Sequence, residues 1–412
     1  MTTSILIGGA FVLTYLGMAI GRLPGLQVDR AWIAFGAAVL LLASGAVPLQ
    51  QAGRLLDWEA LLLLLGMMVV SAQFEFSGVY QRAGTAAARL AQRPLHLLAT
   101  VVLLGGGLSA ILVNDIVAFA LTPVLLLSLR AQGRDPVPYL LALACACNAG
   151  SAASLIGNPQ NILIGQAGRL DFWGYVAASI VPAALALASV FAVIAWLWRG
   201  HWTPAAAPTD AVAALAPERA PAWKPWLAIV ALLLLFSTPL PRELSALLVA
   251  VLVMASRRQS SREYLAAVDW SLLLLFAGLF VVTGAAGELP WAREQAAQLA
   301  ASGQLPQGAL SLAGVALLGS NLIGNVPFVM LLLQVWPQVP AQALVALALL
   351  STLAGNLLIV GSVVNLIVAE SARRHGLALG FMQFARVGIP VTLLSMSLAV
   401  GWLVVSGTLP LR

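Results

Sequence analysis

The sequence predicts an all-α integral membrane protein built from two inverted repeats of five transmembrane helices. Hydrophobic residues make up 61% of the 412-residue chain and charged residues only 9%, whereas soluble domains carry about 25% charged residues. Apolar stretches near the length of a bilayer crossing recur from Ser4 to the end of the chain. Three short motifs also appear twice. The composition and the apolar stretches together lead us to expect that lipid surrounds most of this chain.

The duplicated motifs occur in the same order in both halves. Their first residues, with the separation in the chain, are Asp57 and Asp269 (212), Ser109 and Ser320 (211), and Gly157 and Gly361 (204). Matches in one order at about half the chain length indicate two copies of one unit. We assign residues 1–198 to the first repeat, 199–223 to a cytoplasmic linker rich in Ala and Pro, and 224–412 to the second repeat.

Each repeat is expected to contain three ordinary spans, two long interrupted segments and a last span. In the first repeat these are residues 4–21, 31–48, 58–77, 95–128, 138–168 and 172–198. In the second repeat the interrupted segments are 308–335 and 340–370. We predict that the first interrupted segment of each repeat is a re-entrant helical hairpin, and that the second is a helix broken near its middle.

The distribution of Lys and Arg supports the hairpin interpretation. With hairpins at 95–128 and 308–335, 16 of the 21 cations fall on one side of the membrane and 5 on the other. With full crossings the division is about 11 to 10, and cytoplasmic loops collect Lys and Arg. Arg30 is among the 16 cations assigned to the cytoplasm. Both termini are then expected outside the cytoplasm, and the second repeat is inverted.

Four interruptions in the apolar segments predict a solute site at mid-membrane. They are Asn114-Asp115, Gly157-Asn158-Pro159-Gln160-Asn161, Gly324-Asn325-Val326-Pro327 and Gly361-Ser362-Val363-Val364-Asn365. Unpaired backbone groups in hydrocarbon cost several kcal/mol each, so such chain persists only where it lines a cavity or is buried in protein. Helix N-termini at these breaks attract an anion, while freed carbonyl and Asn oxygens coordinate a cation such as sodium. For a single Asn, the alternative is an interhelical hydrogen bond.

The candidate site residues come from these breaks. We expect the substrate to be bound by Asn114, Asn158, Asn161, Asn325, Ser362 and Asn365. Asp115, with Asn114 and Asn158, is expected to hold a coupling proton or sodium, because ionisable groups inside a membrane usually mark ion paths. The alternative role for Asp115 is to hold the hairpin tip through local N–H bonds. We expect no cofactor, and no metal beyond a sodium at the hairpin tips.

At the same residues the chain resembles the ion transporter superfamily, which includes arsenite efflux permeases, sodium/proton antiporters, citrate-type carriers and divalent-anion:sodium symporters. The stretch from Asn114-Asp115 to Thr122-Pro123 is similar to a hairpin of the arsenite permease group, and 157–161 resembles the anion permease branch. The resemblance implies that substrate and coupling ion sit at the hairpin tips and unwound helices, that members are often homodimers, and that transport is elevator-like. Dicarboxylate symporters carry Ser-Asn-Thr at both tips, and this chain does not.

The resulting hypothesis is a secondary active transporter that moves a small anion across the cytoplasmic (inner) membrane by alternating access, coupled to protons or sodium. Arsenite or antimonite efflux and sodium/proton antiport are alternatives, and a channel is a further one. No catalytic constellation is visible, so we expect no enzyme activity. The scattered cations argue against nucleic acid as a partner. The lipid bilayer is the expected environment, and ATP would be used only through a separate ATPase subunit.

Overall fold

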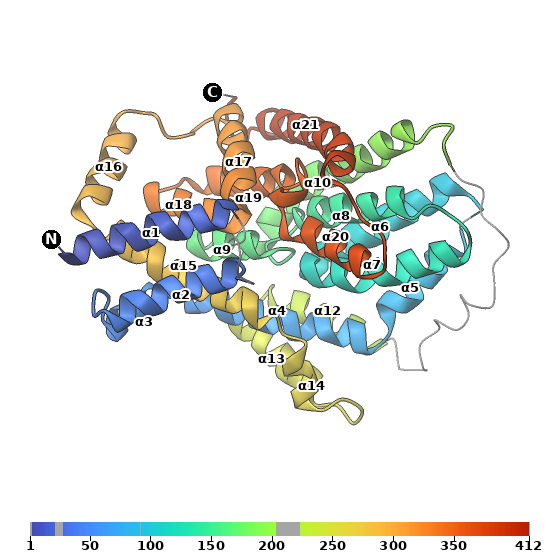
Figure 1. Ribbon diagram of the computed structural model, residues 1–412, viewed down its shortest axis with the longest axis horizontal. Helices are drawn as coiled ribbons and strands as arrows, with labels where there is room; N and C mark the ends of the chain where they lie inside the picture. The colour runs from blue at the N-terminus through green and yellow to red at the C-terminus, as the bar shows by residue number, and fades with distance from the viewer. Residues whose placement is uncertain (1, 21–27, 91, 203–222, 412) are drawn as a thin grey trace.

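The computed structural model describes residues 2–20, 28–90, 92–202 and 223–411, and the regular secondary structure of these residues is entirely helical (Figure 1). No strand occurs within these ranges. Seven of the described helices are long and apolar enough to cross a membrane, and further apolar helices are shorter. The predicted all-α membrane class is therefore confirmed. Most of the predicted linker, residues 203–222, lies outside the described residues.

The helices follow the same order in both halves of the described chain. The first half contains α1 (Thr2–Ile20), α2 (Arg30–Ala43), α3 (Leu49–Leu55), α4 (Trp58–Phe76), α5 (Val79–Ala88), α6 (Pro94–Ile111), α7 (Asn114–Ala131), α8 (Val137–Ser151), α9 (Pro159–Ala167) and α10 (Phe172–Leu197). The second half contains α12 (Trp223–Leu235), α13 (Arg242–Met254), α14 (Ser261–Ala266), α15 (Trp270–Gly287), α16 (Pro290–Ala301), α17 (Ala309–Ile323), α18 (Asn325–Val335), α19 (Ala341–Ala354), the short 3-10 helix η1 (Ile359–Gly361), α20 (Val363–Arg374) and α21 (Phe381–Val405).

The contacts between helices also come in matched pairs. In the shared order, α13 corresponds to α2 and α15 to α4. α2 packs against α15, and α13 packs against α4. Likewise α8 contacts α20 while α19 contacts α9, and α10 packs against its own counterpart α21. Such an exchange of partners is what a two-fold relation between repeats produces, so the packing is consistent with inverted repeats. The exact division at 198 and 224 stays a prediction.

The first predicted hairpin consists of α6 and α7, which are joined by Leu112 and Val113. The second consists of α17 and α18, joined by Gly324 alone. Gly324 has φ +93° and ψ 155°, a region of backbone space that is essentially confined to glycine. In Figure 1 the two hairpins lie in opposite halves of the long axis.

The breaks begin earlier in the chain than the sequence suggested. The interruption between α8 and α9 covers residues 152–158, and the one between α19 and α20 covers 355–362 with η1 inside it. Pro159 and Pro327 lie in the first turns of α9 and α18, so these prolines begin the helices that follow the interruptions. The first N–H groups of a helix have no intrahelical acceptor, and proline is tolerated there because it lacks that N–H.

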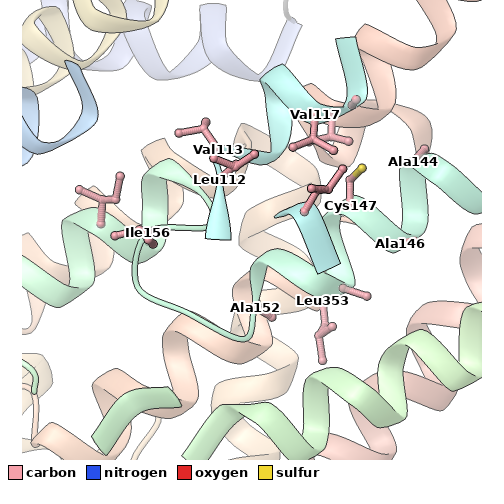
Figure 2. Close-up of a cluster of buried hydrophobic side chains, with 14 of the residues drawn as sticks. Leu112, Val113, Val117, Ala144, Ala146, Cys147, Ala152, Ile156 and Leu353 are labelled. Atoms are coloured by element: carbon pink, nitrogen blue, oxygen red, sulfur yellow. The ribbon is translucent and has the colours of Figure 1, made fainter. Parts of the chain in front are cut away.

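A hydrophobic cluster fixes the first hairpin tip against the first break (Figure 2). Leu112 and Val113 at the tip and Ile156 in the break are almost completely buried. The backbone N–H of Asn114 donates to the carbonyl oxygen of Gly157 over 2.9 Å. A β-carbon on Gly157 would lie 2.6 Å from the carbonyl oxygen of Ser109 at the end of α6. Tip and break therefore form one packed unit, with no space for a side chain between them.

The two cysteines of the chain lie within the same core. Cys145 and Cys147, both in α8, are completely buried and are not linked by a disulfide. Figure 2 shows Cys147 among the aliphatic side chains beneath the hairpin tip. This is the structural role expected of two residues that point to different sides of one apolar helix.

Candidate functional site

Asn161 and Asn365 close the two breaks in the same way. Each lies in the first turn after its break, is almost completely buried, and donates through Nδ2 to two carbonyl oxygens at or just before that break. The acceptors are Ser151 (3.4 Å) and Ser154 (3.0 Å) for Asn161, and Gly355 (2.8 Å) and Leu358 (3.2 Å) for Asn365. Each acceptor pair is separated by the same 204 residues as the two asparagines. The side chains thus satisfy carbonyl groups that the broken helices leave free.

Each of these two asparagines also accepts a hydrogen bond from the other half of the chain. Asn148 of α8 donates through Nδ2 to Oδ1 of Asn365 over 3.1 Å. The hydroxyl of Thr352 in α19 donates to Oδ1 of Asn161 over 3.1 Å. Asn148 and Thr352 are again 204 residues apart. The side chain that closes each break is therefore hydrogen-bonded by the helix that precedes the break in the other repeat. Sequence analysis singled out neither residue, although their shared offset was a usable signal.

Asn158 and Ser362, the last residues before α9 and α20, complete this network. Asn158 Nδ2 donates to the hydroxyl of Thr352 over 3.2 Å, and the Ser362 hydroxyl donates to Oδ1 of Asn148 over 3.0 Å. Asn158 Oδ1 also accepts the N–H of Asn161 over 2.9 Å and caps α9. The network is therefore a rigid, two-fold-related platform of buried amides and hydroxyls.

The hairpin tips meet this platform with asparagine side chains. Asn114 Nδ2 donates to the Ser151 hydroxyl over 3.2 Å and to Asn148 Oδ1 over 3.4 Å. The Oδ1 atoms of Asn114 and Asn325 are buried, and neither has a hydrogen-bond partner among the described residues. Buried polar atoms are normally satisfied. Both tips therefore offer an amide oxygen to a solute, an ion or water.

A cavity of about 50 Å³ lies between the two tips, and four helices begin at it. The first residues of α7, α9, α18 and α20, namely Asn114, Pro159, Asn325 and Val363, all line it. The N-terminus of a helix carries roughly half a positive charge, with N–H groups that have no intrahelical acceptor. Four such ends around one small space create a strongly anion-attracting environment.

Arg30 adds a full positive charge to this cavity. It is the first residue of α2, its side chain lines the cavity, and its Nε is buried without a hydrogen-bond partner among the described residues. An anion in the cavity would supply a partner for this partly buried cation. Sequence analysis counted Arg30 only as a loop cation. No local pattern distinguishes it, because its place at the cavity depends on tertiary packing that brings it beside residues far along the chain.

Asp115 supplies a negative charge at the same place. It is the second residue of α7, lines the cavity and is 9% exposed. Among the described residues nothing donates a hydrogen bond to its carboxylate, so the alternative in which local N–H groups at the tip use it is not seen. Val326 occupies the equivalent position in α18 and also lines the cavity. The two tips are thus alike in their asparagines and unlike in charge.

The predicted site residues divide into two groups in space. Asn114, Asn325 and Ser362 line the cavity together with Asp115. Asn158, Asn161 and Asn365 lie behind it, where their amides are used to hold the breaks. No cluster of three or more His, Cys, Asp or Glu side chains suited to a metal occurs in the described part of the chain.

Comparison with known proteins gives a consistent family. The model of the citrate transporter family matches residues 12–343. The chain is 31% identical to a 46 kDa membrane protein of Mycobacterium leprae, over 84% of this chain and 85% of that protein. It is 25% identical to the silicon efflux transporter LSI3 of Oryza sativa subsp. japonica, over 93% and 94% of the two chains.

Among solved structures, the YdaH transporter of Alcanivorax borkumensis shares the fold, with a TM-score of 0.53 at 17% identity over 99% of both chains. The family model covers most of the sequence, including the first hairpin with Asn114 and Asp115 at its tip, and the second hairpin. The chain therefore belongs to the citrate transporter family of the ion transporter superfamily, and it is a multi-pass membrane transporter.

Proposed function

We propose that the protein is a secondary active transporter that moves a small anion across the cytoplasmic membrane, coupled to protons or sodium. One observation carries this proposal: the N-termini of four helices and the side chain of Arg30 meet at one small cavity. Four half-charges and a guanidinium exceed the single negative charge of Asp115. The excess positive potential favours an anionic solute over a neutral or cationic one.

The size of the cavity restricts the substrate. A water molecule needs about 10–15 Å³ of such space, so a cavity of about 50 Å³ holds only a few water-sized groups. A compact oxyanion is compatible with this volume. A tricarboxylate such as citrate would require the two tips to separate, and the family description alone does not assign citrate to this chain.

The coupling ion is assigned to the hairpin tips. Asp115 and the free Oδ1 atoms of Asn114 and Asn325 provide oxygen ligands or a protonatable group next to the anion. A cation or proton at this position would offset the charge of the incoming anion, which links the two binding events. Arg30 belongs to α2, whereas the tips belong to the hairpins. A displacement of the hairpins relative to α2 would therefore open the cavity, as alternating access requires.

Efflux of a metalloid oxyacid such as arsenite or antimonite is the second candidate. The small cavity accommodates such a solute, and the free amide oxygens could accept hydrogen bonds from its hydroxyl groups. The rice relative is described as a silicon efflux transporter. A neutral oxyacid would gain little from Arg30, so this residue distinguishes the two candidates.

Uptake into proteoliposomes tests the proposal. Phosphate, sulfate, arsenite and citrate would be offered with an imposed pH or sodium gradient, and empty liposomes serve as the control. We expect saturable uptake of a compact oxyanion against its gradient, driven by one of the two ions. Sodium-induced collapse of a pH gradient without any anion flux would instead support sodium/proton antiport, and ohmic single-channel currents would contradict a carrier.

A further inference from the structure

A second polar cavity, remote from the hairpin tips, is lined by basic side chains. It has a volume of about 180 Å³ and lies where α12 begins and α13 ends. Lys224 is the second residue of α12, and Arg257 and Arg258 follow α13. Among the described residues, no Asp or Glu lines this cavity. It therefore carries a concentrated positive charge.

The walls of this basic cavity are fixed by hydrogen bonds. The hydroxyl of Ser256 accepts the N–H of Arg258 over 3.2 Å and the N–H of Gln259 over 3.4 Å, which shapes the loop after α13. On the α4 side, Gln73 donates to the hydroxyl of Ser77 and accepts a hydrogen bond from Tyr264. The cations thus extend from an ordered polar surface.

An apolar groove continues from the basic cavity along α12 and α13. This groove has a volume of about 260 Å³ and shares Gln73 and Lys224 with the basic cavity. Its other walls include Leu227, Ala231 and Leu252, and the two leucines are 57% and 71% exposed in the isolated chain. Charge at one end and open hydrocarbon at the other give the combined cavity the amphipathic pattern of a lipid.

Tryptophans place the junction of the two cavities at the membrane surface. Trp223 lines the groove beside Lys224 and is 60% exposed. Trp226, one turn further along α12, packs edge-on against Phe74 with ring centroids 5.3 Å apart. Tryptophan is enriched at the level of lipid headgroups, where its ring is apolar and its N–H stays hydrated.

We propose that the basic cavity and the groove form one binding site for an anionic phospholipid. The phosphate lies near Lys224, Arg257 and Arg258, and one acyl chain lies in the groove between α12 and α13. Basic pockets between membrane helices recognise anionic headgroups, and the cytoplasmic leaflet supplies such lipids. A free phosphate would use the basic cavity alone and would leave the adjoining groove without a function. The continuity of the two cavities therefore favours a lipid.

Thermal unfolding of the purified full-length protein in detergent tests this site. Phosphatidylglycerol, phosphatidylcholine and soluble glycerol 3-phosphate would each be titrated, and the midpoint shift would give an apparent affinity. We expect a saturable shift with phosphatidylglycerol and a much smaller shift with the other two. Equal shifts with both lipids, or a full shift with glycerol 3-phosphate, would overturn the proposal.

Two variants locate the effect. Each surface cation contributes about 1 kcal/mol to anionic lipid binding, so Lys224→Gln with Arg257→Gln should weaken phosphatidylglycerol binding about 25-fold at about 1.4 kcal/mol per factor of ten. Arg89→Gln with Arg93→Gln removes two cations that line neither cavity and should leave binding unchanged. Ala231→Trp fills the groove and should also weaken lipid binding. Equal affinities in all variants would refute the site.

Discussion

Replacing Arg30 by glutamine gives the sharpest test of an anion site between the hairpin tips. The substitution removes the cationic side chain from the cavity lining while it keeps a polar chain. A hydrogen bond to a charged group contributes about 1.5–3 kcal/mol, so anion affinity should fall about 10- to 150-fold at about 1.4 kcal/mol per factor of ten. Because the buried Nε of Arg30 has no partner in the described protein, stability without ligand should not fall.

The assay is a thermal-shift titration of purified protein with the anion that proteoliposome uptake identifies. Arg30→Lys keeps the positive charge but lacks the planar guanidinium, which can donate two parallel hydrogen bonds to an anion. It should therefore lose less affinity than Arg30→Gln. Arg386→Gln is the matched control, because it removes an exposed arginine of α21 that does not line the cavity. The thermal unfolding midpoints of all variants, measured without the anion, would show that each protein is folded.

Two results would refute the reasoning about Arg30. One is an unchanged anion affinity in Arg30→Gln. The other is an equal loss of affinity for a neutral oxyacid such as silicic acid, because a neutral solute gains no Coulomb energy from the guanidinium. That second result would indicate that Arg30 shapes the cavity without attracting charge.

Three further predictions concern the tips and the breaks. Asp115→Asn should leave the protein folded and inserted but abolish gradient-driven uptake, and unchanged uptake would overturn its coupling role. Gly324→Ala forces a side chain into a backbone region that is essentially confined to glycine, so it should lower the free energy of unfolding by about 1–3 kcal/mol. Gly380→Ala is the control in the same thermal unfolding assay. Gly380 has φ −75° and open space around it, so this substitution should change the stability little. Asn161→Ala and Asn365→Ala each remove a side-chain donor from two carbonyl oxygens, so each should destabilise the protein by about 1–3 kcal/mol. The loss should be at least as large for Asn161→Ala, which also removes a hydrogen bond to the Tyr175 hydroxyl, and an unchanged unfolding midpoint in either variant would contradict this role.

The hairpins and broken helices could be predicted because their signals are local. Asn and Gly within long apolar segments are unfavourable in lipid, so their presence near Asn114 and Gly324 marked the tips. The 204-residue offset between Asn161 and Asn365 correctly paired residues that make equivalent hydrogen bonds. The starts of the helices were predicted less accurately, because a proline such as Pro159 is compatible both with a break and with the first turn of the helix that follows it.

The composition of the cavity, and of the hydrogen-bond network behind it, could not be read from the sequence. Arg30 lies more than 80 residues before Asn114, and only tertiary packing brings both to the same space. Asn148 and Thr352 lie inside uninterrupted apolar helices, where a single polar residue usually makes an ordinary interhelical contact. Their role emerges only when both repeats are superimposed in register. Periodicity reports which face of a helix is apolar, but it does not report which distant helix will cover that face.

The most direct test of the central claim is a cryo-EM structure of the protein saturated with the anion that stabilises it most. We predict density for the anion between the two tips, within hydrogen-bonding distance of the Arg30 guanidinium and of N–H groups at the starts of α7 and α18. Density for that anion elsewhere, with the space between Asn114 and Asn325 filled only by water, would contradict this account.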